Sequence, residues 1–217
     1  MSTLLATQLY YRFNDASPWV LSGLGVELQA GDACVIVGDN GCGKTTLGKV
    51  LTGLYRPVYG EVYLTGSDVH RLRAASRITY AGYMAQVSYL QFFTHSLVDE
   101  IESTRRRAAS RIGEEDLAHA YSALGLPNDR TTNPLDLSPP QMWRFQLLLF
   151  AVVMNPLFLF IDEIVGPSAE IQRSALQFVL DRRHGHGQIT VVAYQRQVRN
   201  CAFTRKMEMV KGTLQDA

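Results

Sequence analysis

The chain has 217 residues, of which 47% are hydrophobic and 19% charged, which is enough apolar material for one buried core and too little charge for a disordered chain. Its 21 basic and 20 acidic residues give a net charge of +1, so no strongly basic surface indicates nucleic acid as the main partner. Three widely spaced cysteines exclude a disulfide scaffold and suggest a reducing compartment.

No stretch has the length of a membrane-spanning helix, which needs about 20 apolar residues. The longest apolar run, residues 147–154, is interrupted by Asn155 and Pro156. The first four residues lack a basic region followed by an apolar stretch, so we expect no signal peptide. A protein of this kind would serve a membrane only through partners.

The first third of the chain is rich in predicted strands, at residues 9–13, 26–28, 33–37, 61–64 and 78–83. Residues 33–37 are continuously apolar, as expected of a strand that is buried on both faces. A helix is predicted from about Lys44 to Leu54.

From about Gln86 to Met154 the pattern is helical. Ser96 can cap a helix that begins at Leu97, and acidic residues 114–116 open another. Ser138 followed by Pro139 predicts the start of a long helix that runs to Met154. Buried strands are then predicted at 157–161 and 189–193, on either side of a helix at 168–183. This alternation indicates an α/β core with a mainly parallel sheet. We expect a single domain over residues 1–217, with a helical lobe inserted at about 87–154.

A glycine-rich loop follows the strand at 33–37. Its residues, Gly38-Asp39-Asn40-Gly41-Cys42-Gly43-Lys44-Thr45, fit the phosphate-binding pattern G-x-x-x-x-G-K-[ST], between a strand and a helix. The glycines let backbone N–H groups turn toward phosphate oxygens, and the helix N-terminus adds a positive dipole end. We predict that Lys44 reaches the β- and γ-phosphates and that the Thr45 hydroxyl ligates Mg²⁺. Thr46 completes the predicted nucleotide-binding set.

Two carboxylates end the predicted strand at 157–161. Asp162 would hold Mg²⁺ through water, and Glu163 would polarise the attacking water in hydrolysis. The alternative is that both are acidic strand-end residues that cap a loop. The sequence has no Asn-Lys-x-Asp motif, which a GTPase would be expected to show.

These motifs and their order resemble those of ATP-binding-cassette (ABC) transporter ATPases, from about Thr7 to Gly212. Leu137-Ser138-Pro139-Pro140-Gln141 stands where that family has its signature Leu-Ser-Gly-Gly-Gln. The resemblance implies a P-loop NTPase core with a mainly parallel sheet, an N-terminal antiparallel β portion and an inserted helical lobe.

The resemblance also assigns roles to individual residues. It implies that Gln86 senses Mg²⁺ and that Phe13, or alternatively Tyr11, stacks on adenine. Ser138 and Gln141 would face the ATP that is bound by a partner subunit. The surface from Gln86 to Phe93 would contact a membrane subunit, with core packing of its aromatic residues as the alternative.

Three departures from the family pattern affect the hydrolytic machinery. Pro139 and Pro140 replace the signature glycines and lack backbone N–H groups. The switch histidine is absent, and Tyr194-Gln195 occupies its place. Gln195 is our preferred equivalent, since an amide can donate a hydrogen bond although it cannot be a cation. Residues 164–169 lack the aspartate of the family's D-loop. Binding chemistry is therefore expected to be intact and hydrolysis weakened.

The resemblance implies the ATP-binding subunit of a membrane transporter, peripheral on the cytoplasmic side of the cell membrane, which couples MgATP binding and hydrolysis to substrate transport. ATP and Mg²⁺ are the expected cofactors. The expected partners are transmembrane subunits and a second ABC ATPase subunit, in a heterodimer rather than a homodimer. No nucleic-acid partner is expected. Two alternatives stay open: a soluble ABC-type ATP-dependent clamp that acts on nucleic acid or ribosomes, and a non-hydrolysing regulatory nucleotide-binding subunit.

Overall fold

A six-stranded sheet forms the centre of the fold, which is described by a computed structural model for residues 3–86, 88–163, 170–195 and 201–217. Its strands are β3 (Ala33–Val37), β6 (Ala81–Met84), β7 (Phe158–Asp162), β8 (Ile189–Tyr194), β9 (Arg205–Val210) and β10 (Thr213–Asp216). They lie in the order β10-β9-β3-β8-β7-β6. All neighbours are parallel except β9 and β10. The mainly parallel sheet is therefore confirmed.

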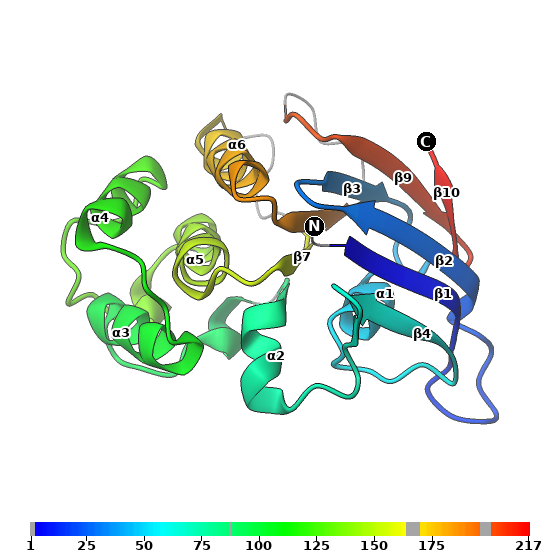
Figure 1. Cartoon of the computed structure of the whole chain (residues 1–217). Coiled ribbons are helices and arrows are strands. Elements are labelled where there is room, and N and C mark those ends of the chain that lie inside the picture. The colour runs from blue at the N-terminus through cyan, green and yellow to red at the C-terminus, as the bar shows by residue number, and fades with distance from the viewer. Residues whose placement is uncertain (1–2, 87, 164–169, 196–200) are drawn as a thin grey trace.

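A second, antiparallel sheet covers one face of the first (Figure 1). It contains β1 (Thr3–Tyr11), β2 (Leu21–Gln29), β4 (Tyr59–Leu64) and β5 (Ser67–Asp68), in the order β2-β1-β4-β5. Helix α1 (Lys44–Leu51) packs in one apolar cluster with residues of both sheets. Gly48 of α1 has no room for a Cβ atom because the Phe160 ring of β7 lies against it. This contact fixes the glycine-rich loop at the start of α1 relative to the acidic end of β7.

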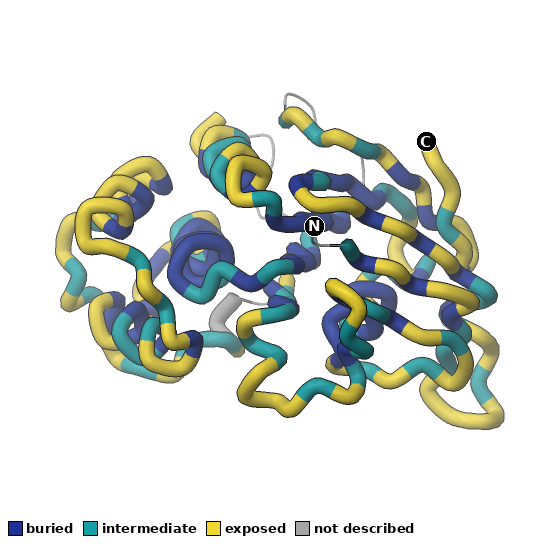
Figure 2. The backbone as a smooth tube through the Cα atoms, in the orientation of Figure 1, coloured by how far each residue is buried: buried dark blue, intermediate teal, exposed yellow. Residues whose placement is uncertain are grey.

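Helices α3 (Leu97–Ala108) and α4 (Glu114–Ala123) lie at the end of the molecule farthest from the antiparallel sheet (Figure 1). Helix α5 (Pro139–Leu147) lies between them and the six-stranded sheet. α5 continues as a π-helix, Leu148–Met154, and most of its length is buried (Figure 2). Of two further helices, α2 (Ala74–Tyr80) packs against β6 and α3, and α6 (Glu170–Gly185) packs against β8 and α5. Within the described ranges, no helix combines the length and the apolar composition needed to cross a membrane.

Several sequence predictions of elements are confirmed. The strand at 33–37 is β3, and its first four residues are buried as the apolar run requires. Ser96 caps α3, since its Oγ accepts a 3.1 Å hydrogen bond from the Asp99 backbone N–H. Ser138 is the N-cap of α5, with Pro139 at the first helical position. The helix does reach Met154, although its last seven residues have π geometry.

Other boundaries were wrong for identifiable reasons. The strand predicted at 78–83 begins only at Ala81, where its pairing with Phe158 of β7 begins, because residues 78–80 form the last turn of α2. The strand predicted at 9–13 is the end of β1, which starts at Thr3. A bulge at Gln8, with φ of 51°, breaks the alternation there, and Phe13 lies in the turn that follows.

The structure also differs from the sequence predictions at the ends of two helices and in two strands that were not predicted. α1 stops at Leu51, just before Gly53 with φ of 75°. α6 extends to Gly185, while the first two residues of the predicted helix, 168 and 169, lie outside the described residues. β9 and β10 were missed, although Met207 and Met209 of β9 alternate into the core.

Candidate nucleotide-binding site

The carboxyl ends of β3, β7 and β8 meet at a cavity of about 470 Å³. In parallel sheets this edge is where ligands bind. The residues that line the cavity are Phe13, Val20, Asn40, Gly41, Gly43, Lys44, Thr45, Thr46, Gln86, Asp162, Glu163, Ala193, Tyr194 and Gln195. Most of the residues predicted from the sequence to bind or hydrolyse nucleotide are therefore brought together in one place.

The glycine-rich loop wraps around the Lys44 ammonium group. Its Nζ donates hydrogen bonds to the backbone oxygens of Gly38 at 2.7 Å and Asp39 at 2.9 Å. Gly41 and Gly43 have φ of 80° and 113°, a region that glycine enters without the steric cost of a Cβ atom. The loop is thus a tight cradle with a cation at its centre and the N-terminus of α1 behind it.

Gly38, Asp39 and Cys42 do not line the main cavity. They line a second hollow of about 550 Å³ on the other side of the loop, where they lie with Glu208 and Met209 of β9. Gly38 leaves space for the Met209 backbone oxygen, which a Cβ atom would approach to 2.5 Å. Their side of the loop faces β9, so any contact of these three residues with phosphate would be made by the backbone.

Asp162 is the buried anionic centre of the cavity wall, with 5% of its surface exposed. Its Oδ2 accepts hydrogen bonds from the Thr45 hydroxyl at 2.8 Å and from the Tyr83 phenol at 2.6 Å. Burial, and then the hydrogen bond to Asp162, raise the pKa of Tyr83 well above its usual value. The phenol therefore stays protonated and acts as the donor. A hydroxyl and a carboxylate side by side are a suitable pair of hard oxygen ligands for Mg²⁺.

Glu163 follows in an unusual backbone conformation, with φ of 73°. Its backbone N–H donates to Ala193 of β8 at 3.0 Å, and its backbone oxygen accepts from Trp143 Nε1 at 3.3 Å. These bonds fix the residue between the sheet and α5. Glu163 lines the cavity together with Gln86 and Gln195, so the carboxylate has access to a ligand bound there.

An aromatic cluster stands at the open side of the cavity. Phe13 is 63% exposed and lines the cavity, while Tyr11 is half-buried beneath it. The Phe13 ring meets Tyr11 edge-on at 5.5 Å, and Tyr11 stacks on Tyr55 at 5.4 Å. Of the two aromatic candidates for stacking on a base, Phe13 is the one placed to contact a ligand in the cavity.

The candidates for the missing switch histidine lie side by side after β8. Tyr194 and Gln195 both line the main cavity, and Gln195 also lines the hollow behind the loop. Gln195 is exposed and Tyr194 half-buried. Because both residues line the main cavity, their positions do not decide which of them is the counterpart of the switch histidine. Residues 164–169, where the D-loop aspartate was found missing from the sequence, lie outside the described residues.

Ser138 and Gln141 are placed apart from this cavity, at the start of α5. The Gln141 Oε1 accepts hydrogen bonds from the Ser138 backbone N–H at 3.0 Å and from its hydroxyl at 2.8 Å. Ser138 is exposed and Gln141 half-buried, so the N-terminus of α5 is presented at the surface. This arrangement suits a role toward a ligand held by another subunit rather than toward the chain's own cavity.

The segment after Gln86 divides into a buried and an exposed part. The Phe92 ring packs on Phe145 of α5 at 5.6 Å, whereas Leu90 and Phe93 are 66% and 70% exposed. The core-packing alternative therefore holds for Phe92, which packs against the core, whereas Leu90 and Phe93 are exposed apolar residues. Contact of this segment with a membrane subunit stays a prediction. The side chain of Tyr89 lies outside what the structure describes.

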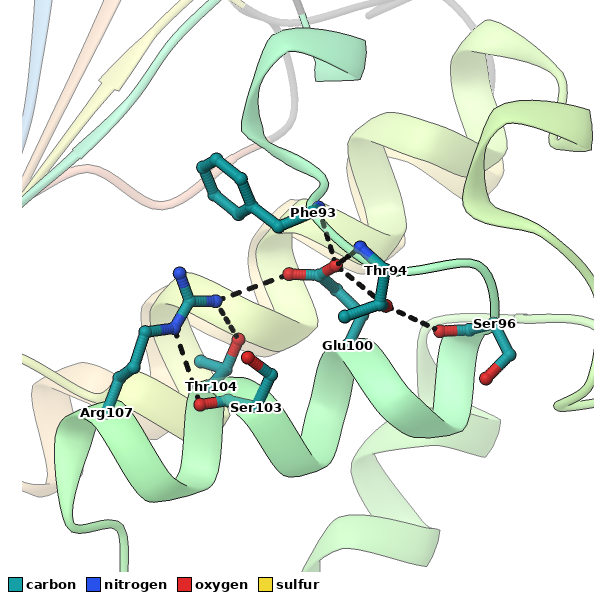
Figure 3. A network of polar contacts seen from close by, with 7 residues as sticks. All are labelled: Phe93, Thr94, Ser96, Glu100, Ser103, Thr104 and Arg107. Atoms are coloured by element: carbon teal, nitrogen blue, oxygen red, sulfur yellow. Dashed lines mark hydrogen bonds and ion pairs between the residues drawn. The ribbon is translucent and has the colours of Figure 1, made fainter.

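A buried carboxylate, Glu100 of α3, holds the end of this segment (Figure 3). Its Oε2 accepts hydrogen bonds from the backbone N–H groups of Phe93 and Thr94, both at 2.8 Å, and from the Thr94 hydroxyl at 2.9 Å. Its Oε1 pairs with Arg107 at 3.3 Å, and the Arg107 guanidinium lies 5.1 Å from the centre of the Phe93 ring. The exposed Phe93 is thus held in place by α3.

Sequence reasoning missed Tyr83, Trp143, Gln91, Gln146 and Glu100 as residues that shape the site and its surroundings. Tyr83 stood in a predicted strand, yet only the strand order places it beside Asp162. One available signal was polarity. Gln146 and Glu100 occur at positions that the helical pattern places inside, and buried polar groups require partners.

Comparisons with known proteins agree with these features. A family model for ABC transporters matches residues 21–166. A protein assigned as an ABC transporter ATP-binding protein in Bacillus thuringiensis subsp. konkukian is 28% identical over 160 residues, which cover 74% of this chain and 29% of that protein. Another, from Pyrococcus furiosus, is 27% identical over 188 residues, which cover 85% of this chain and 70% of that protein. The chain thus spans under a third of the first relative.

Solved structures have the same fold. A bacterial Atm1-family ABC exporter with ATP bound matches with a TM-score of 0.81 and 19% identity, over 99% of this chain and 38% of the exporter chain. A dimeric ATP-binding cassette in a post-hydrolysis state, bound to ADP and Pi, matches with a TM-score of 0.77 and 16% identity, over 98% of both chains. The predicted fold class, a P-loop core with a mainly parallel sheet and antiparallel strands, is therefore confirmed.

Proposed function

Because the chain belongs to the ABC transporter family, we propose that it is the ATP-binding subunit of a membrane transporter, which couples MgATP binding and hydrolysis to substrate transport. The observation that carries the proposal is the convergence of Lys44, Thr45, Asp162 and Glu163 on one cavity. We further propose that residues 1–217 form a single nucleotide-binding domain, with a helical lobe inserted at about 87–154.

The loop and its neighbours fit a nucleoside triphosphate. Lys44 Nζ lies within the loop, where a phosphate chain would meet its charge and the backbone N–H groups of Gly41 to Thr45. Thr46 is nearly buried at the cavity wall, so its contribution to binding is by its backbone. Phe13 offers an exposed ring for stacking on the base.

Mg²⁺ would be held by Thr45 and Asp162, and Gln86, which lines the same cavity, would sense it. The fit rests on two oxygens, Thr45 Oγ1 and Asp162 Oδ2, which lie 2.8 Å apart beside the phosphate loop. When bound, Mg²⁺ neutralises charge on the β- and γ-phosphates during phosphoryl transfer. The Tyr83 phenol orients the Asp162 carboxylate in advance.

Hydrolysis would depend on Glu163, which lines the same cavity and whose carboxylate would orient and deprotonate the attacking water. Gln195 would donate a hydrogen bond to the terminal phosphate. Because an amide carries no charge, it would stabilise the developing negative charge less than a protonated histidine. We therefore propose that hydrolysis is weakened.

Ser138 and Gln141 would complete the site of a second ABC ATPase subunit, since they lie apart from the chain's own cavity. Two chains would then close head-to-tail on two ATP molecules. We propose a heterodimer with a subunit that has the typical signature glycines, in which the two sites hydrolyse ATP at different rates.

The remaining partners would be transmembrane subunits, which place this chain on the inner face of the cell membrane. The exposed Leu90 and Phe93 give them an apolar surface in the segment after Gln86, and Glu100 holds the backbone of Phe93. Nucleic acid is not a proposed partner, because the net charge is only +1.

Calorimetry of MgATP binding to the Lys44→Ala variant tests the proposal. The substitution removes a charge-assisted phosphate contact, so affinity should fall by roughly 10- to 150-fold. Lys206→Met is the control: Lys206 is exposed on β9 and does not line the cavity, so affinity should stay unchanged. Equal affinity in wild type and Lys44→Ala would refute the assignment. Hydrolysis by the purified assembly that falls when Glu163 of this chain is replaced by Gln would exclude the non-hydrolysing alternative.

A further inference from the structure

The side-chain amide of Gln91 forms hydrogen bonds with the outer edge of β6, as the backbone of a neighbouring strand would. Its Nε2 donates a 3.1 Å hydrogen bond to the Tyr83 backbone oxygen, and its Oε1 accepts a 2.9 Å bond from the Ala85 backbone N–H. β6 stands at the end of the sheet among the described strands, and alternate residues direct their backbone groups to this outer edge. One side-chain amide therefore fixes the end of β6 that leads to Gln86.

The same oxygen of Gln91 is bound by a helix. Gln146 of α5 has no exposed surface, and its Nε2 donates a 2.7 Å hydrogen bond to Gln91 Oε1. Phe145 and Leu147 beside it are also fully buried. An amide in such apolar surroundings costs free energy unless it is hydrogen-bonded, so the contact with Gln91 fixes both side chains.

The two elements joined in this way belong to different parts of the proposed site. On β6, the Tyr83 phenol binds Asp162, and Gln86 lines the cavity. α5 begins at Ser138. A continuous series of short contacts therefore runs from Asp162 through Tyr83 and Gln91 to Gln146. Glu100 fixes the residues just after Gln91 to α3, so this segment is held by the lobe at two points (Figure 3).

We propose that Gln91 and Gln146 are positioning residues that transmit nucleotide binding at Asp162 to α5 and thereby to Ser138. The inference rests on the proposed function. A ligand that moves Tyr83 or Gln86 displaces the end of β6, and Gln91 is bonded to that strand end and to α5 through one oxygen. The helix must follow the strand, or the 2.7 Å hydrogen bond between Gln91 and Gln146 breaks.

Hydrogen–deuterium exchange of the purified full chain, with and without MgATP, tests this link. In the wild type, MgATP is expected to slow exchange by about threefold or more both in residues 81–86 and in residues 141–147. Gln91→Met and Gln146→Met each remove the shared hydrogen bond while keeping side-chain volume. Each variant should bind MgATP within about threefold of the wild-type affinity and protect residues 81–86, but not residues 141–147. The double variant should lose no more than either single one.

Two further variants separate the link from a general loss of packing. Gln91→Glu keeps an acceptor oxygen for Ala85 and Gln146 but loses the donor to the Tyr83 backbone oxygen, so the protection of residues 141–147 should fall between that of the wild type and that of Gln91→Met. Gln188→Met removes a comparable buried amide contact, to the Asn155 backbone oxygen, and should keep the full protection. If one Met variant fails to fold, the other removes the same bond.

Full MgATP-dependent protection of residues 141–147 in a folded Gln91→Met or Gln146→Met variant would overturn the inference. So would a wild type that binds MgATP without protecting residues 141–147; in that case the proposed function would stand. A wild type that shows no MgATP binding by calorimetry would overturn the proposed function, and the inference with it.

Discussion

The phenol of Tyr83 donates a 2.6 Å hydrogen bond to Asp162 Oδ2, the same oxygen that accepts from Thr45 at 2.8 Å. Burial raises the pKa of Tyr83, so the phenol keeps its proton at neutral pH. Two donors on one oxygen hold the carboxylate in a single orientation at the cavity wall before any ligand binds. Preorganisation of this kind spares the site a rearrangement when phosphate charge develops.

Tyr83→Phe should therefore destabilise the fold, since it removes one of the two donors from a carboxylate that has 5% of its surface exposed. Hydrogen bonds to charged groups are worth about 1.5–3 kcal/mol, and we expect a loss in that range in urea unfolding. Tyr63→Phe is the control, because its partner Glu61 is exposed; it should change stability by less than about 0.5 kcal/mol. Equal small losses in both variants would show that the Tyr83 bond is not stabilising.

The Glu163→Gln variant keeps the shape of the side chain but removes the proposed base. We expect ATP to remain bound and hydrolysis by the purified assembly to fall by about 10²- to 10⁴-fold. Glu115→Gln, on the exposed face of α4, should leave the rate unchanged. Wild-type turnover in Glu163→Gln would mean that the residue is misassigned or that a partner's site performs all the hydrolysis. Making the equivalent change in the partner as well separates these two explanations.

The segment after Gln86 allows a sharp comparison between neighbouring residues. Phe92→Glu should destabilise the fold by about 3–5 kcal/mol, because it places a charge against Phe145 in the core. Leu90→Glu should leave the thermal midpoint nearly unchanged and prevent co-purification with membrane subunits, since Leu90 is 66% exposed. A folded Leu90→Glu chain that still assembles would show that the membrane partner docks elsewhere.

The parts of the site that sequence reasoning located are those formed by adjacent residues. Gly38 to Thr45 form their cradle within one loop, so residue type and spacing were enough to predict Lys44 at its centre. Asp162 and Glu163 were located because a buried strand must deliver its last residues to the same edge of the sheet.

The parts that it missed depend on packing between distant segments. The bond between Tyr83 and Asp162 requires that β6 lie beside β7, and the bond between Gln91 and Gln146 requires the position of α5 over the sheet edge. Neither follows from local pattern. The start of β6 at Ala81 likewise did not follow from the β-prone residues 78–80, which form the last turn of α2.

We predict that the buried Cys34 thiol lowers the free energy of unfolding at alkaline pH. Burial raises the pKa of its thiol from 9.0 to about 12. Above about pH 9 the unfolded chain releases the thiol proton while the folded chain retains it, so this group lowers stability by up to about 1.4 kcal/mol per pH unit. Urea unfolding from pH 8 to 10.5 should show a shallower decline in Cys34→Val than in the wild type. Cys201→Ala should change the slope less, because that thiol is only half-buried. Equal slopes in all three chains would contradict the assignment.

Pro139 and Pro140 occupy the first two positions of α5, and neither has a backbone N–H group to offer a ligand. The other two polar groups at this end, Ser138 and Gln141, are bonded to each other. The loss of a preorganised donor to developing charge costs about 10²- to 10³-fold in rate. In a homodimer, both sites would combine these prolines with Gln195 in place of a histidine. A partner with signature glycines would divide the two defects between the sites.

Two measurements test this expectation of a heterodimer. Replacing both prolines, Pro139→Gly with Pro140→Gly, should speed hydrolysis at the partner's site, because it restores two N–H groups at the N-terminus of α5. Pro57→Gly, in the loop before β4, is the control and should have no effect. The decisive measurement is reconstitution of this chain alone with its membrane subunits. We expect weak ATPase activity, and robust cargo-stimulated hydrolysis by such a homodimer would show that the prolines do not limit the reaction and that no second type of subunit is needed.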